Sequence, residues 1–157
     1  GPLIKQAAID TVAGLIADAV AHGAELIAGG KLLPELGPLY YAPTLIFGIT
    51  PAMRIAQEEI FGPVIAIQAF TDEAQAIRLA NAAPVGLAGY FCTEDYRRIE
   101  RVSTLLECGM LGINTGAISH VYNAFGGIKE SGIGREGSPV GIAEYQEIKN
   151  ITLGDLA

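Results

Sequence analysis

The chain has 157 residues, enough for about one domain, and half of its residues are hydrophobic while 17% are charged. Ten Lys and Arg against 17 Asp and Glu give a net charge of −7, which argues against nucleic acid or an anionic membrane surface as a partner. The longest apolar runs, such as 64–67, fall far short of the roughly 18 residues that a membrane span requires. Since the chain has only two cysteines and its first residues do not resemble a signal peptide, a cytoplasmic protein is expected.

The first third of the sequence predicts one helix followed by two strands. Apolar residues recur at helical spacing over residues 5–22, and a glycine ends this helix. A short strand is expected at 24–28, closed by two glycines, and a second strand at 40–47. The expected buried stripe of the helix comprises Ile9, Val12, Ile16, Ala19 and Val20.

From residue 63 onward, apolar segments of strand length alternate with helical stripes. Strands are predicted at 64–70, 87–92 and 110–113, and the two helices between them begin at the capping segments 71–73 and 93–95. The strands are apolar throughout, which is typical of a parallel sheet that helices cover on both faces. The sequence therefore predicts an α/β fold with a parallel sheet and flanking helices.

After Asn114 the pattern changes to a glycine-rich segment at 115–141 with little periodicity, and loops of this length are usually functional. The segment contains a GxGxxG motif at 132–137, which cradles a dinucleotide only between a strand and a helix. Polar loop precedes the motif here and Pro139 follows it, so a surface loop with positive φ angles is favoured over a nucleotide site. A final strand is predicted at 145–153.

The side chains with catalytic potential are scattered along the chain. Cys92 lies in a predicted buried strand, and Cys108 lies at a helix end, where the negative end of the dipole would raise its thiol pKa. His22 and His120 have no other His or Cys at metal-ligand spacing. The pattern therefore predicts neither a catalytic residue nor a metal site within this chain.

Four stretches in fixed order carry a resemblance to a known family. Residues 1–4 read GPLI and residues 58–64 read EEIFGPV. Residues 123–129 read NAFGGIK, with Ala124 in place of the usual Pro, and residues 131–137 read SGIGREG. The set spans essentially the whole chain and resembles the aldehyde dehydrogenase superfamily.

Within that superfamily, segments 112–119 and 134–138 are most similar to succinate-semialdehyde dehydrogenases. The departures at Ala124 and at 120–122 leave another semialdehyde, or an unbranched aldehyde, open as the substrate. A catalytically inactive α/β module that serves oligomerisation also remains open.

The resemblance implies that the chain is the C-terminal part of a longer enzyme. Residues 1–144 would form part of the catalytic domain, and residues 145–157 the oligomerisation strand and tail. In the family, the nucleophilic Cys, the general-base Glu and the Rossmann domain that binds most of the NAD or NADP lie outside the matched part, so the chain alone is expected to be inactive. The full-length parent is expected to act on a small aldehyde as a dimer or tetramer of identical subunits.

The resemblance also implies four site residues. Glu59 matches a carboxylate that hydrogen-bonds the nicotinamide ribose, and Phe61 matches a ring that packs beside the nicotinamide. Ser119 matches a hydroxyl that helps to hold the distal carboxylate of succinate semialdehyde. Phe125 matches an aromatic side chain at the mouth of the substrate tunnel.

Overall fold

The computed structural model describes residues 1–155, and the chain divides into two compact units, Gly1–Ala83 and Pro84–Ala157. Each unit combines helices with a parallel strand pair, which confirms the α/β class. The division falls within the segment 1–144, whose assignment to one catalytic domain stays a prediction. None of the helices in residues 1–155 is long and apolar enough to cross a membrane.

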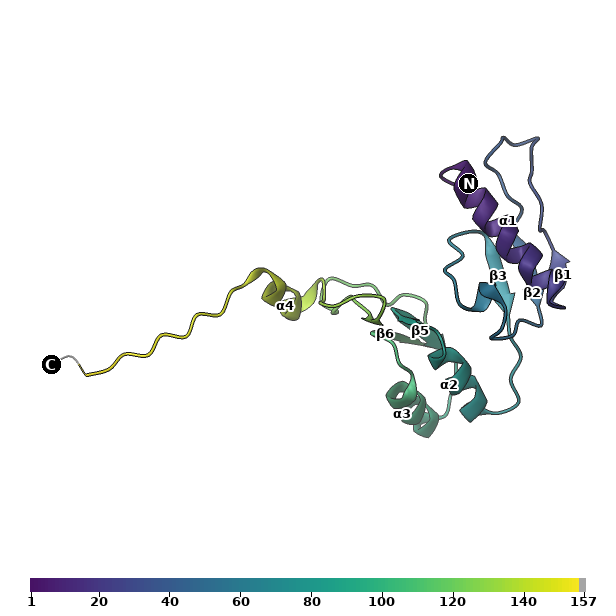
Figure 1. Ribbon diagram of the computed structural model, residues 1–157. Coiled ribbons are helices and arrows are strands. Elements are labelled where there is room, and N and C mark those ends of the chain that lie inside the picture. Colours follow the sequence, from purple (N-terminus) through teal and green to yellow (C-terminus); the bar gives the residue numbers. More distant parts are fainter. Residues whose placement is uncertain (156–157) are drawn as a thin grey trace. The chain divides into compact units, whose positions relative to one another are not determined.

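The first unit contains a long helix and a three-stranded sheet (Figure 1), and two shorter helices lie later in its sequence. Helix α1 spans Gln6–Ala21, in agreement with the predicted helix at 5–22. The sheet has the order β1 (Glu25–Ala28), β2 (Thr44–Phe47) and β3 (Val64–Ile67). Strand β2 pairs antiparallel with β1 and parallel with β3. Because Pro43 has no amide hydrogen to donate to a sheet, β2 begins only at Thr44, later than the predicted 40–47.

One hydrophobic core lies between α1 and this sheet. Ile46 of β2 is fully buried, as is Met53 just before the short helix η1 (Arg54–Ala56). Val20 was predicted in the helical stripe but is 45% exposed, since it lies at the edge of the stripe, and Leu15 is buried instead. The α1 residues in the core are Ile9, Val12, Leu15, Ile16 and Ala19.

The two capping segments predicted for the later helices are confirmed. Helix α2 (Glu73–Asn81) begins after Asp72, whose side chain accepts a main-chain hydrogen bond at 2.7 Å. Helix α3 (Tyr96–Leu105) begins after Asp95, which accepts one at 2.9 Å. Both acids accept hydrogen bonds from amides that would otherwise have no partner in the first turn, and their negative charges interact favourably with the positive end of the helix dipole.

The second unit contains one strand pairing that the sequence predicted, the parallel pair formed by 87–92 and 110–113, and one that it did not. Strands β5 (Ala88–Phe91) and β6 (Met110–Ile113) form a parallel pair connected by α3. Strands β4 (Val85–Gly86) and β7 (Ile128–Lys129) form a separate antiparallel pair.

The prediction of one parallel sheet through 64–70, 87–92 and 110–113 is therefore wrong. Strand β3 pairs with β2 in one sheet, and β5 pairs with β6 in another. The expected burial on both faces is also wrong, because most of β3 is exposed and β5 alternates between exposed and half-buried residues. An apolar run indicates that a strand is present, but it does not specify which neighbour supplies the hydrogen bonds.

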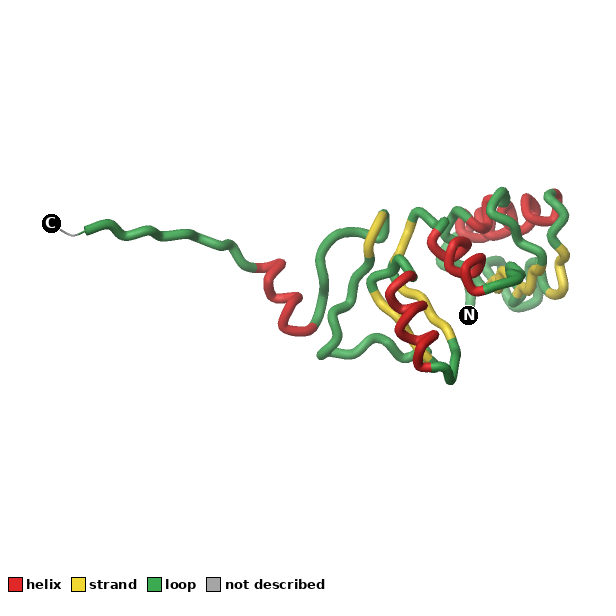
Figure 2. The backbone as a smooth tube through the Cα atoms, turned by 90° about the horizontal axis from the view of Figure 1, so that it is seen from below, coloured by secondary structure: helices red, strands yellow, loops and turns green. Residues whose placement is uncertain are grey.

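A long loop, residues 114–127, joins β6 to β7, and it is drawn in green in Figure 2. After β7 the chain forms α4 (Ser138–Gly141) and then η2 (Ile142–Tyr145). The strand predicted at 145–153 is wrong for this single chain: Tyr145 ends η2, and residues 146–155 form no strand (Figure 1). A strand requires a hydrogen-bonding neighbour, so a role for this segment in oligomerisation stays a prediction. Residues 156–157 of the predicted tail lie outside the described residues.

Candidate active site

Glu59 and Phe61 lie in the turn between η1 and β3, residues 57–63. Both side chains are exposed, and Phe61 is exposed to 81%. The φ angle of Phe61 is 45°, in the left-handed region that bulky residues rarely occupy. Such strain persists only when the surrounding structure holds it, and it is often found at ligand-binding segments. The turn therefore presents a carboxylate and an aromatic ring together.

The end of this turn is fixed to the sheet and to α1. The carbonyl of Pro63 accepts a hydrogen bond from the amide of Thr44 at 2.8 Å. A Cβ atom on Gly62 would lie only 2.5 Å from Cγ2 of Val12, so the main chain of the turn lies directly on α1. A larger residue at position 62 would push the turn away from the helix.

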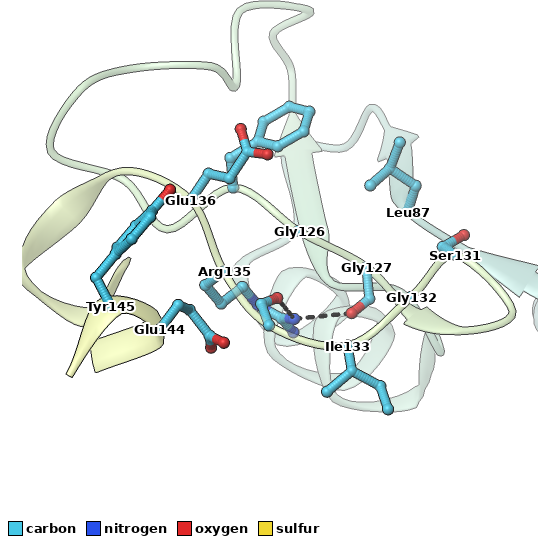
Figure 3. A pocket seen from close by; sticks show the side chains of 12 residues that line it. Leu87, Gly126, Gly127, Ser131, Gly132, Ile133, Arg135, Glu136, Glu144 and Tyr145 are labelled. Carbon is cyan, nitrogen blue, oxygen red and sulfur yellow. Dashed lines mark hydrogen bonds between the residues drawn. The ribbon is translucent and has the colours of Figure 1, made fainter. Parts of the chain in front are cut away.

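Phe125 lines an open pocket of about 260 Å³ in the second unit, shown in Figure 3. Its walls come mainly from two glycine-rich segments, 125–127 and 131–136, with further contributions from Leu87, Glu144 and Tyr145. The main chains of Phe125 and Glu136 pair through two hydrogen bonds of 2.8 and 2.7 Å. The pocket combines apolar walls with charged groups, which suits a small polar molecule.

Arg135 holds the two glycine-rich segments together. Its Nη1 atom donates to the carbonyl oxygens of Gly127 at 2.8 Å and Gly134 at 2.7 Å (Figure 3). A Cβ atom on Gly126 would lie 2.7 Å from the Gly134 carbonyl, so this packing requires a glycine. All three glycines of the GxGxxG motif at 132–137 have the positive φ angles expected of a loop. The motif nevertheless follows the two-residue strand β7 and directly precedes the four-residue helix α4, so the expectation that no helix follows it is wrong.

Ser119 lies on the same loop as Phe125, but it is not among the residues that line the pocket. Its side chain is exposed. The loop begins at Asn114, which has a φ of 55° and whose side chain bridges the main chain of Thr93. Asn114 Oδ1 accepts from the Thr93 amide and Nδ2 donates to the Thr93 carbonyl, both at 2.8 Å. The starting point of the loop that carries Ser119 is therefore fixed.

The four predicted site residues fall into two pairs in different units. Glu59 and Phe61 belong to the first unit, where they share one turn, and Ser119 and Phe125 belong to the second. Glu59 and Phe61 are thus both exposed on one turn, whereas Ser119 lies outside the pocket of Phe125. Their roles toward cofactor and substrate stay predictions.

The two thiols differ in their surroundings, and His22 lies on the surface. Cys92 is exposed just after β5, so the prediction that it is buried is wrong. Burial raises the pKa of the Cys108 thiol, which confirms the predicted direction with desolvation as the cause. His22 is solvent-exposed at the end of α1, where its Nδ1 lies 2.8 Å from the Asp18 carbonyl. Within residues 1–155, no group of three His, Cys, Asp or Glu side chains could hold a metal ion.

The sequence interpretation missed three residues that organise these segments. Asn114 and Arg135 bind main-chain atoms, and no pattern in a sequence identifies such contacts. Arg54 pairs with Glu58, and the four-residue spacing of opposite charges was a signal that could have been used.

The aldehyde dehydrogenase family matches residues 1–151, and the chain belongs to this family. It is 47% identical over 156 residues to succinate-semialdehyde dehydrogenase [NADP(+)] 1 of Schizosaccharomyces pombe, covering 99% of this chain and 31% of that protein. It is also 47% identical to the mitochondrial succinate-semialdehyde dehydrogenase of Homo sapiens, of which it covers 29%. The crystal structure of succinate-semialdehyde dehydrogenase from Burkholderia pseudomallei matches with a TM-score of 0.89 at 48% identity, over 92% of this chain and 30% of that one. The chain thus spans about 30% of the length of these relatives.

Proposed function

We propose that these residues form the C-terminal part of a longer NAD(P)-dependent aldehyde dehydrogenase that oxidises succinate semialdehyde to succinate. The proposal is supported by the 47% identity to enzymes named for that substrate, and by the limited share of their length that the chain covers. The full-length enzyme would be a homo-oligomer, and the present chain alone would be inactive because the nucleophilic Cys and most of the cofactor site belong to the rest of the enzyme.

The observation that carries the proposal is the exposed pair of Glu59 and Phe61 on one anchored turn. The residues present fit a nicotinamide riboside: a carboxylate can accept hydrogen bonds from two neighbouring ribose hydroxyls, and an aromatic face can pack against a flat ring. When bound, the nicotinamide supplies the two-electron oxidant for the aldehyde. In this proposal, Glu59 orients the ribose and Phe61 limits the position of the ring.

Ser119 and Phe125 would act on the substrate. A semialdehyde carries a carboxylate at the end opposite the reacting carbonyl, and burying that charge without a partner would cost several kcal/mol. The exposed hydroxyl of Ser119 can donate one hydrogen bond to such a group. Phe125, whose main chain is held by Glu136, would form part of the apolar wall beside the carbon chain.

A second candidate substrate class also carries an anion. The chain is 46% identical over 154 residues to 3-sulfolactaldehyde dehydrogenase of Pseudomonas putida, covering 98% of this chain and 32% of that protein. A sulfonated aldehyde likewise presents acceptor oxygens at its far end. A full-length enzyme that prefers such a substrate would keep the proposed chemistry and change only the anion that it recognises.

The test compares substrates in the full-length enzyme that contains these residues. A hydrogen bond to a charged group contributes roughly 1.5–3 kcal/mol, so Ser119→Ala should lower kcat/KM for succinate semialdehyde about ten- to a hundredfold. An uncharged aldehyde of equal length should be affected much less, because it does not need the donor. A preference for the sulfonated aldehyde in the unaltered enzyme would select the second candidate. Equal losses with charged and uncharged substrates would show that Ser119 shapes the loop and does not bind the anion.

A further inference from the structure

The turn that carries Glu59 and Phe61 is anchored at both of its ends. After Phe61, Gly62 packs on Val12 and the Pro63 carbonyl bonds to β2. Before Glu59, the chain is held at Glu58 by Arg54. Only residues 59–61 lie between the two anchors.

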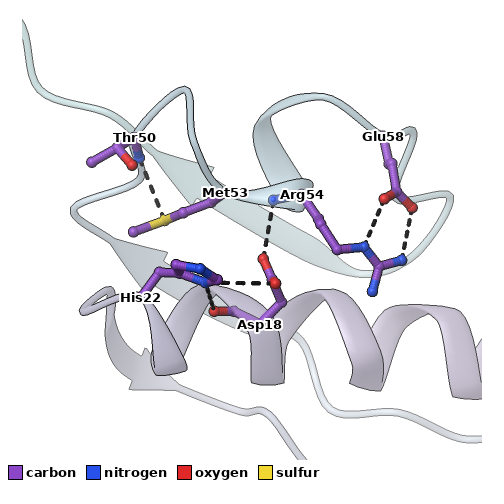
Figure 4. A network of polar contacts seen from close by, with 6 residues as sticks. All are labelled: Asp18, His22, Thr50, Met53, Arg54 and Glu58. Carbon is purple, nitrogen blue, oxygen red and sulfur yellow. Dashed lines mark hydrogen bonds and ion pairs between the residues drawn. The ribbon is translucent and has the colours of Figure 1, made fainter.

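The anchor at Glu58 uses both its main chain and its side chain (Figure 4). The Glu58 amide donates to the Arg54 carbonyl at 2.8 Å. The guanidinium of Arg54 donates from Nε to Oε1 of Glu58 at 2.7 Å and from Nη2 to Oε2 at 2.9 Å. Such a two-point pair fixes direction as well as distance. The hydrogen bond from Arg54 also lowers the pKa of the Glu58 carboxyl, as expected for a carboxylate paired with a guanidinium.

Both anchors are fixed to the same helix, α1. The Arg54 amide donates to Oδ2 of Asp18 at 3.0 Å, and Figure 4 shows this contact on the side of α1 that faces η1. Val12, six residues earlier in the same helix, lies against Gly62. The positions of Glu59 and Phe61 are therefore both defined relative to α1.

We propose that Arg54 and Glu58 are positioning residues for the oxidation step, because they hold the three-residue segment 59–61 in the conformation that contacts the nicotinamide. The inference rests on the proposed function of Glu59 and Phe61. Phe61 adopts an unfavourable left-handed φ, and it keeps this angle only while both ends of the segment are fixed. Removal of the first anchor allows Phe61 to relax and moves Glu59 with it. Since most of the cofactor would be bound elsewhere, its affinity should change little while the reaction slows.

The experiment uses the full-length enzyme that contains these residues. Arg54→Ala and Glu58→Gln should each lower kcat roughly three- to tenfold and change the cofactor KM less than about twofold, since the pair is half exposed and water screens it partly. Arg54→Lys keeps the charge but cannot form the two-point hydrogen-bonded pair, so its kcat should lie between that of the unaltered enzyme and that of Arg54→Ala. The exchanged pair, Arg54→Glu with Glu58→Arg, should recover part of the loss. Hydrogen exchange at the Glu58 amide, which donates to the Arg54 carbonyl, should accelerate in Arg54→Ala because the side-chain pair no longer holds this turn closed.

A matched control lies in the same unit. Gln6 donates to Asp10 at 2.9 Å, and this exposed pair has the same four-residue spacing but supports no turn. Gln6→Ala should change neither kcat nor the exchange at the Glu58 amide.

Glu59→Gln separates failure of the inference from failure of the proposed function. If Glu59→Gln slows the oxidation step while Arg54→Ala changes neither kcat nor hydrogen exchange, the positioning role is wrong and the proposed function stands. If Glu59→Gln leaves the step unchanged, the role of the turn toward the nicotinamide is wrong, and the inference fails with it. A variant of Arg54 that raises the cofactor KM and leaves kcat intact would also overturn the inference, since it would indicate binding and not positioning.

Discussion

Phe61 and Asn114 are two of the four non-glycine residues with positive φ angles in the described part of the chain. Both have φ angles in the left-handed region, at 45° and 55° respectively. Asn tolerates this region because its amide can bond to nearby main chain, whereas a Phe there costs about 1–2 kcal/mol. Two hydrogen bonds to Thr93 stabilise Asn114 in this conformation, whereas Phe61 is held in place only through its neighbours in the chain. The strained aromatic residue is thus the one for which an external partner is proposed.

The two cysteines should differ in reactivity. Burial raises the pKa of the Cys108 thiol, so at pH 8 it forms less thiolate than an ordinary cysteine, and its Sγ also lies 3.2 Å from the Met110 carbonyl. Cys92 is exposed. Iodoacetamide should therefore alkylate Cys92 several times faster than Cys108 at pH 8, as followed by peptide mass spectrometry. The gap should narrow as the pH rises and Cys108 ionises. Faster labelling of Cys108 would contradict its described environment.

At the scale of elements, the two hydrogen bonds between the Asn114 side chain, just after β6, and the main chain of Thr93, just after β5, should stabilise the start of the long loop. Asn114→Ala removes both hydrogen bonds to Thr93. It also places an alanine at a positive φ angle, where no side-chain hydrogen bond offsets the strain. We expect a loss of about 1–3 kcal/mol in the free energy of unfolding, measured by urea denaturation. Asn114→Gly loses the same bonds but tolerates the φ angle, so its loss should be smaller. If the glycine variant were the less stable of the two, the strain argument for Asn114 would be wrong.

Helices were easier to predict than strand pairing, for a physical reason. The boundaries of α1, and the capping roles of Asp72 and Asp95, depend on contacts within about four residues, which the sequence displays directly. Sheet order depends on distant partners. Strand β3 pairs with β2, about 20 residues earlier, although its apolar run looks the same as those of β5 and β6.

In the candidate site, too, the features that local sequence displays could be predicted, and those that depend on distant contacts could not. Glu59, Phe61, Ser119 and Phe125 were identified from the family resemblance, because their local motifs survive in this chain. The residues that hold those motifs in place were not identified: Arg54 and Arg135 act through main-chain carbonyls, a carboxylate and packed glycines. The contacts of Arg135 depend on the folded conformation of loops, for which the sequence has no periodic signal, whereas the four-residue spacing of Arg54 and Glu58 was a usable one.

At the scale of the whole molecule, the segment after η2 has the features of an interface. Its apolar side chains are exposed in the single chain: Ile148 to 99%, Ile151 to 78% and Leu153 to 77%. Residues 146–155 form no strand, so their main-chain groups have no sheet partner within the described chain. An extended segment of this kind can add to a sheet edge of another subunit and bury its apolar side chains there. This is the physical basis for expecting that the full-length enzyme associates through residues 145–157.

Deletion of residues 146–157 from the full-length enzyme should therefore shift it toward smaller assemblies in sedimentation velocity experiments. Because apolar and polar residues alternate over 150–153, substitutions on one face of the segment can be compared with substitutions on the other, which is a sharper test than deletion. Ile151 and Leu153 would share one face of an added strand, and Asn150 and Thr152 the other. Ile151→Lys with Leu153→Lys should weaken assembly strongly, because it would bury two charges, whereas Asn150→Lys with Thr152→Lys should have a much smaller effect. If both double variants and the deletion sedimented as the unaltered enzyme does, the subunits would associate through another surface, and the exposed apolar residues of this segment would need a different partner.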